Sequence, residues 1–181
     1  MTEDKFAALL VADKEYSDDS LELLTQWAEH NSEQFLKSEA SKALTSSQRD
    51  NVYFILTSLT ELAYSYFLQK PNQWNNEMLI EVCTDIMPRK ISAEPAFFYD
   101  IVPVLRPFLA WCEKEGILSK TGSMQKRIIK IKQQIEDSAA NPENFGLAKS
   151  LLMSAVEHGV DMENVEDLQE FLQRQVAQKK T

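Results

Sequence analysis

The sequence predicts an all-α fold, a single irregular bundle of seven or eight helices around one central apolar helix. Apolar residues recur at spacings of three and four along most of the chain, and the alternation typical of strands does not recur. Only 4 Gly and 6 Pro occur among 181 residues, too few for the many tight turns of a β-sandwich or barrel. Hydrophobic residues make up 44% and charged residues 26%, which is typical of a globular chain. We expect one helical domain over residues 1–181.

The first part of the chain shows short helical patterns with a break between them. Residues 3–12 have the spacing of a short helix. Ser20 is a suitable N-cap for a helix with apolar residues on one face. The His-Asn-Ser run at 30–32 is typical of a break, and the helical period resumes over residues 35–44. We therefore expect one helix on each side of this break.

The next helix is the most apolar one. Ser46 or Ser47 can cap it, and it should run to about Gln69, because Pro71 cannot continue the helical hydrogen bonds. Its apolar residues cover most of the circumference, as in a helix that others enclose. We therefore place this helix at the centre of the bundle.

Prolines limit the helices in the middle of the chain. A helix that begins at residues 75–76 should end at Pro88. Residues 97–115 are helical by pattern, but they include Pro103 and Pro107. Each interior proline removes a hydrogen bond and crowds the preceding turn, so we expect a kink or a break in this segment.

Three further helices should complete the fold. Gly116 is suited to close the proline-containing segment as a C-cap. Helices are then expected over residues 123–138, over 141–158 with Asn and Pro at its start, and from about residue 164 onward. In the first of these, four apolar residues should face inward: Met124, Ile128, Ile131 and Ile135.

The chain is acidic, with a formal net charge of −9 and a pI of about 4.8. Such a surface repels phosphates, which disfavours general nucleic-acid binding. Residues 116–142 reverse this charge locally, with 5 bases against 2 acids. Lys126, Arg127 and Lys130 cluster there on one side of a helix, so a nucleic-acid-associated regulator is one alternative function.

The cysteines and histidines do not match a cofactor or metal motif. Cys83 and Cys112 lie in no CxxC pair, and their spacing from His30 and His158 fits no zinc site. We expect no cofactor and no metal. Two thiols without a disulfide framework, no secretory signal and no membrane-length apolar run favour a cytoplasmic protein.

Carboxylates offer the few candidates for catalysis. Glu81 and Asp85 share a helix face, where paired acids can bind a cation or exchange a proton. Glu61 lies on the narrow polar strip of the central helix, and we expect it to be partly buried. No nucleophile elbow, P-loop or zinc-protease motif accompanies them. An enzyme that uses Glu61 or the Glu81–Asp85 pair therefore stays an alternative, and the balance leans against catalysis.

The leading interpretation is a non-catalytic protein-interaction module that binds an unknown protein partner or a second copy of the chain. An apolar or aromatic groove near residues 95–115 would suit a partner helix. The candidate partner-binding residues are Phe97, Phe98, Phe108 and Trp111. The alternative for these side chains is the core of the bundle.

The C-terminal part of the chain, about residues 95–178, contains a distinctive motif around an Asn-Pro-Glu-Asn run. Its residues are Asn141, Pro142, Asn144, Phe145, Gly146, Lys149, Gly159 and Asp161. Residues 101–171 resemble a group of uncharacterised bacterial helical proteins whose pattern reads NPENWG-AKS…GVD. Phe145 stands here in place of Trp. Some of these relatives carry a zinc-binding SEC-C motif, but this chain lacks its cysteines, so zinc is not implied.

The same motif has a physical interpretation as a helical hairpin. Asn141 and Pro142 suit a helix start, and Gly159 suits the left-handed residue after a helix. Gly146 is small enough for another helix to approach. Lys149 could instead reach a carboxylate or an anionic ligand, so a ligand site stays an alternative to a purely structural hairpin.

Overall fold

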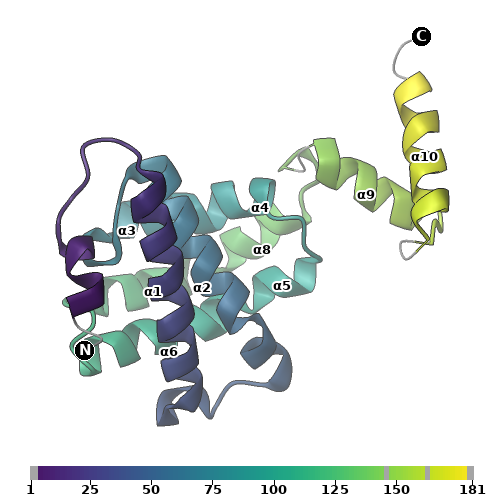
Figure 1. The fold of residues 1–181 in the computed structure, drawn as a ribbon. Coiled ribbons are helices and arrows are strands. Elements are labelled where there is room, and N and C mark those ends of the chain that lie inside the picture. The colour runs from purple at the N-terminus through teal and green to yellow at the C-terminus, as the bar shows by residue number, and fades with distance from the viewer. Residues whose placement is uncertain (1–3, 145–146, 162–163, 179–181) are drawn as a thin grey trace. The chain divides into compact units, whose positions relative to one another are not determined.

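The computed structural model describes residues 4–144, 147–161 and 164–178 (Figure 1). The described residues form an all-α fold without any β-strand, which confirms the predicted class. Eight of their α-helical segments have six or more residues, in agreement with the expected seven or eight. The chain divides into two compact units, residues 1–140 and 141–181. No helix in the described parts is long and apolar enough to cross a membrane.

The first long helix is continuous where the sequence predicts a break. A 3-10 helix, η1 (Asp4–Leu10), precedes α1 (Asp18–Lys37), and Ser17 rather than Ser20 is the N-cap of α1. The expected break at residues 30–32 is wrong. The Asn31 amide donates to Trp27 O (2.8 Å) and the Ser32 hydroxyl to Ala28 O (2.7 Å). Because both polar side chains bond to carbonyls of the preceding turn, they are buried without interrupting the helix.

A short 3-10 helix, η2 (Glu39–Ser41), replaces the second helix expected over residues 35–44. The long helix α2 (Ser46–Phe67) follows, and a capping box starts it one residue before the expected cap. Thr45 Oγ1 accepts from Gln48 N (3.2 Å), and Thr45 N donates to Gln48 Oε1 (3.0 Å). Leu68 ends α2 in the left-handed conformation, with a φ of 54°.

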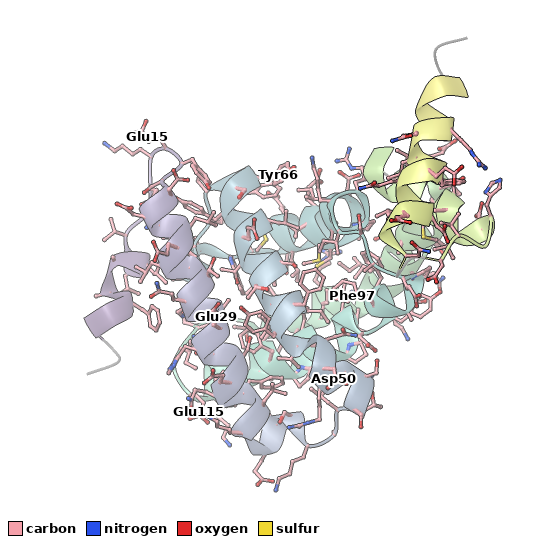
Figure 2. All side chains as sticks on the ribbon, turned by 45° about the vertical axis from the view of Figure 1, so that its right-hand side comes forward. Glu15, Glu29, Asp50, Tyr66, Phe97 and Glu115 are labelled. Carbon is pink, nitrogen blue, oxygen red and sulfur yellow. The ribbon has the colours of Figure 1, made fainter. Side chains whose placement is uncertain are left out.

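Helix α2 is central in the first unit, as predicted, but its enclosure is incomplete. It packs against α1, α6 and α3, and α1 and α2 lie side by side (Figure 1). Its inner residues are fully buried, Ile55, Leu56 and Leu59 among them. Four aromatic side chains stay 37–48% exposed, contrary to the expectation of a fully covered helix: Tyr53, Phe54, Tyr66 and Phe67. Figure 2 shows Asp50 and Tyr66 near opposite ends of α2.

The helix after α2 continues past the proline that should end it. Asn75 caps α3 (Asn76–Glu81), which passes into a π-helical turn, η4 (Val82–Ile86), and then α4 (Met87–Lys90). The predicted end at Pro88 is therefore wrong by two residues. A π-helical turn has hydrogen bonds of wider span, and here Met87 N donates to Val82 O. This rearrangement just before Pro88 lets the helix continue.

The proline-containing segment is interrupted at Asp100, before the two prolines at which the sequence predicts a kink or a break. Helix α5 (Pro95–Tyr99) ends there and α6 (Ile101–Lys114) begins. Pro103 lies in the first turn of α6. Backbone N–H groups there make no hydrogen bond within the helix, so a proline removes none. Pro107 lies inside α6. After α6, Gly116 has a φ of 73°, and Ile117 N donates to Cys112 O (2.8 Å), so the expected C-cap is confirmed.

The first unit ends with α7 (Gly122–Lys130) and α8 (Lys132–Ala140). The predicted helix over residues 123–138 is thus divided at Ile131. All four of its predicted inward residues are buried: Met124, Ile128, Ile131 and Ile135.

The second unit is a helical hairpin. A 3-10 turn, η5 (Pro142–Asn144), precedes α9 (Leu147–Glu157), and α10 (Val165–Gln178) packs on α9. Gly159 has a φ of 70°, as expected for the residue after a helix. Asn164 caps α10, since its side-chain oxygen accepts from Glu166 N (3.0 Å). These contacts confirm the two helix boundaries that the sequence places there.

A partly buried ion pair joins the N-terminal segment to the residues that follow α2. Lys70 Nζ lies 2.7 Å from Asp13 Oδ1, and the Lys70 side chain is only 3% exposed. The other Asp13 oxygen accepts from the Tyr64 hydroxyl, and that hydroxyl accepts from Ser17 N (3.0 Å). Burial alone would raise the pKa of Asp13, but the hydrogen bonds from Lys70 and Tyr64 and the positive charge lower it to about 2.

This pair predicts acid-sensitive stability. The pKa of Asp13 lies below the 3.8 of an unperturbed aspartate. The ionised carboxylate therefore stabilises the fold above that value, and its contribution is lost as the pH falls toward about 2. We expect Asp13→Asn to lower the free energy of unfolding by about 2 kcal/mol near neutral pH and by almost nothing near about pH 2. Urea titrations of both proteins at several pH values measure this, and an equal difference throughout would contradict it.

Candidate functional site

The four candidate partner-binding aromatics are core residues. Phe97, Phe98, Phe108 and Trp111 are each 7% exposed or less. The ring of Phe108 lies 5.5 Å from that of Phe35 in an edge-on arrangement, and the rings of Phe97 and Phe98 lie 5.2 Å apart. Their expected role in an exposed docking groove is therefore corrected, because their rings are packed inside the bundle.

An apolar groove does lie on the same segment, on the opposite face of α6. It has a volume of about 590 Å³. Pro103, Pro107 and Ala110 repeat at helical spacing along its floor. These short side chains leave a hollow between α6, the η2 region and α7. The other apolar residues that line it include Ala40, Ala43, Leu44 and Ile129.

Hydrogen bonds hold the walls of this groove. The Arg49 guanidinium donates to Ser41 O (3.1 Å) and Leu36 O (3.1 Å), which fixes the η2 loop beside α2. The Asp100 carboxylate accepts from Ser47 Oγ (3.0 Å) and Asn51 Nδ2 (2.8 Å), which ties the start of α6 to α2. These side-chain hydrogen bonds therefore fix the positions of the elements on either side of the groove.

Cations border the groove. Arg106 and Lys132 line it, and no acidic residue does so in the part of the chain that the structure describes. Arg106 is exposed and forms no ion pair with a described residue, whereas Lys132 lies 3.7 Å from Glu136. Ile129 is 46% exposed beside them. An exposed apolar side chain between two cations favours a ligand with an apolar face and negative charge.

The predicted basic patch lies on a helix that contributes to the groove, although none of its three residues lines the groove. Lys126, Arg127 and Lys130 are exposed on α7, the helix that supplies Ile129 to the groove. The sequence identified this patch but missed Arg106, Pro107 and Ile129. Pro103, Pro107 and Ala110, at spacings of four and three opposite the large apolar face of the same helix, are the signal that indicates the groove.

The candidate carboxylates are not assembled into a reaction centre. Glu61 is exposed, contrary to the expected partial burial, whereas Thr60 beside it is buried, so the polar strip of α2 does not lie on one face. Glu81 is exposed, and Asp85 forms an ion pair with Arg89 one turn later. Among the described residues, no three His, Cys, Asp or Glu side chains lie close enough together to hold a metal ion.

The family-motif residues are spread over the second unit. Asn141 Oδ1 accepts from Glu143 N (3.0 Å) and so caps the turn that contains Pro142 and Asn144. Gly159 and Asp161 line a hollow of about 560 Å³ within the hairpin. Phe145 and Gly146 lie outside the described residues, as does the side chain of Lys149.

The two histidines have separate local roles. His158 Nδ1 lies 2.7 Å from Ser154 O near the end of α9, a carbonyl that also accepts from His158 N (3.0 Å). Its ring lies 5.5 Å from that of Phe171 on α10. His30 lies on α1, and its ring is 5.9 Å from that of Phe6. In each case the nearest described aromatic ring comes from the neighbouring helical segment.

Comparisons of this chain with family models, with curated proteins and with solved structures found no match. The resemblance to the bacterial helical family therefore stays a prediction.

Both cysteines are free thiols in the core, and their reactivity gives a test of that burial. Cys83 and Cys112 are fully buried, and burial raises the pKa of Cys83 to about 12 and that of Cys112 further. Since the thiolate is the reactive form, we expect an aromatic disulfide reagent to label neither thiol in the folded protein at neutral pH. In urea, the labelling rate should rise with the unfolded fraction. Rapid labelling of either thiol without denaturant would contradict the described core.

Proposed function

We propose that this chain is a non-catalytic protein-interaction module whose α6–α7 groove binds an amphipathic helix with acidic flanks. One observation carries the proposal: an apolar groove, bordered by exposed cations, lacks any acidic residue in its described lining. Because both cysteines are free thiols, the proposal places the module in the cytoplasm.

The shape of the groove supports a helix as the occupant. Pro103, Pro107 and Ala110 extend over two turns of α6, which corresponds to about 10 Å. Proline has no backbone N–H, so Pro103 and Pro107 present only apolar ring atoms to a ligand. The floor therefore favours apolar contact over hydrogen bonding to an extended strand. A helix that presents apolar residues at spacings of three and four over two or three turns matches such a floor.

The charge pattern supports an acidic occupant. The chain has a net charge of −9, yet residues 116–142 carry a net charge of +3. Arg106 and Lys132 line the groove, and Lys126 and Lys130 are exposed on α7, the helix that supplies Gln125 and Ile129 to it. A local positive charge on an acidic chain attracts acidic peptide segments. It therefore raises the rate at which they associate with the groove and the specificity of their binding.

Nucleic acid is the second candidate ligand, because the same cations could contact phosphates. Lys126, Arg127 and Lys130 are exposed, as phosphate-binding side chains must be. The apolar floor and the half-exposed Ile129 have no role in such binding, and no aromatic residue lies among the three cations for base stacking. The helix proposal uses both the apolar and the charged parts of this surface, so we favour it.

The proposal predicts the binding of a designed peptide. The probe is a fluorescent helical peptide of about 18 residues with leucines along one face and glutamates on both flanks. We expect saturable binding that weakens more than about tenfold in Ile129→Glu, because a carboxylate would then lie in the apolar floor. Arg106→Glu should weaken it about fivefold through charge repulsion. Fluorescence anisotropy measures both affinities.

Controls separate this surface from general electrostatic attraction. Lys14→Glu makes the same change of charge as Arg106→Glu at an exposed residue outside the groove, and it should leave the affinity unchanged. A peptide with lysines in place of the glutamates should bind more weakly. The proposal fails if Ile129→Glu binds as well as the unaltered protein, or if a DNA or RNA oligonucleotide binds at low salt and the peptide does not.

A further inference from the structure

A second cavity, of about 490 Å³, lies between η1, α1 and the end of α6. Four aromatic side chains contribute to its walls: Phe6, Trp27, His30 and Trp111. The core holds both indole rings in place. That of Trp27 lies edge-on to Trp74 at 5.8 Å, and that of Trp111 lies 5.7 Å from the ring of Phe35. These aromatic walls are therefore rigid before any ligand enters, which reduces the entropic cost of binding.

The N-terminal segment that closes one side of this cavity is also fixed. Lys70 Nζ donates to Ala8 O (3.3 Å) in addition to its ion pair with Asp13. Asn72 Nδ2 donates to Leu10 O (3.2 Å). These bonds hold η1 over the cavity through its backbone, so its Phe6 side chain stays opposite α1.

The polar groups of the cavity favour a positive charge. Glu115 is the only acidic residue among its described lining residues, which include no lysine and no arginine; His30 lines it as well. The lining continues through Gly116 to Leu118, where α6 ends, and the C-terminal end of a helix carries partial negative charge. Figure 2 labels Glu115 at this end of the first unit. An anionic ligand would meet the Glu115 carboxylate there, with no lysine or arginine among the described lining residues to offset it.

From this arrangement we infer that the η1–α1–α6 cavity binds an organic ammonium group attached to an apolar or aromatic body. The aromatic faces attract the cation, Glu115 and the end of α6 stabilise its charge, and Leu9, Ile117 and Leu118 contact the apolar body. The cavity shares no lining residue with the α6–α7 groove. Binding at one site is therefore testable without binding at the other.

Three small probes of matched size test the choice of charge. They are benzyltrimethylammonium, benzyl alcohol and benzoate, each titrated into the full chain while tryptophan fluorescence is recorded. Trp27 and Trp111 line the cavity and report on its occupation. We expect saturable binding of the ammonium probe, weaker binding of the alcohol and none of benzoate. A capped Phe-Lys dipeptide tests whether a lysine side chain of a peptide can supply the cation in place of a free amine.

Two variants test the residues. Glu115→Gln should weaken the ammonium probe about threefold and leave benzyl alcohol unchanged, since only the charge differs. Phe6→Leu should also weaken the ammonium probe about threefold, because it keeps an apolar wall but removes an aromatic face. Glu15→Gln is the matched control at an exposed carboxylate that does not line the cavity, and Figure 2 shows Glu15 far from Glu115.

The inference is overturned by any of three results. These are no saturable change with the ammonium probe, benzoate binding as tightly as that probe, or Glu115→Gln and Glu15→Gln having the same affinity as the unaltered protein. Circular dichroism confirms that each variant keeps its helical content, so that a loss of binding is assigned to the cavity.

Discussion

Both sites depend on the burial of one face of α6. Val104, Leu105, Phe108 and Leu109 are fully or almost fully enclosed, and α6 packs against α2 and α7 through this face. With its large side chains committed to the core, α6 turns two prolines and an alanine to the other side, where they form the floor of the groove. The same burial places the end of α6 beside α1, where the second cavity begins. One buried helix face thus determines where both surfaces lie.

The two sites select ligands of opposite charge. The groove is bordered by Arg106 and Lys132 and has no acidic residue in its described lining, whereas the cavity has Glu115 and neither lysine nor arginine in its described lining. Because the chain has a net charge of −9, a positively charged border attracts acidic segments that the rest of the surface repels. The carboxylate of the cavity has the same sign of charge as the chain as a whole. An acidic helix and an organic cation would therefore not compete for one surface.

The sequence predicts the elements well where apolar spacing alone decides them. The inward residues of the 123–138 region are one example. The glycines that follow α6 and α9 are also predicted well, because glycine adopts the left-handed conformation more readily than other residues. It fails where a side chain has two possible roles. Asn31 and Ser32 resemble a helix break until the carbonyls of the preceding turn satisfy them, and Phe108 and Trp111 resemble a docking surface until Phe35 packs against them. The Lys70–Asp13 pair joins residues 57 positions apart, which no local pattern indicates.

The central claim is that the face of α6 turned away from the core is a binding surface. The most direct measurement is a two-dimensional NMR titration of the full, isotope-labelled chain with the acidic helical peptide. The account predicts that the shifting amide signals belong to the two turns of α6 around Arg106 and Ala110 and to the part of α7 around Gln125 and Ile129. Shifts confined to the second unit, or to Lys126 and Lys130 without any change along α6, would contradict it.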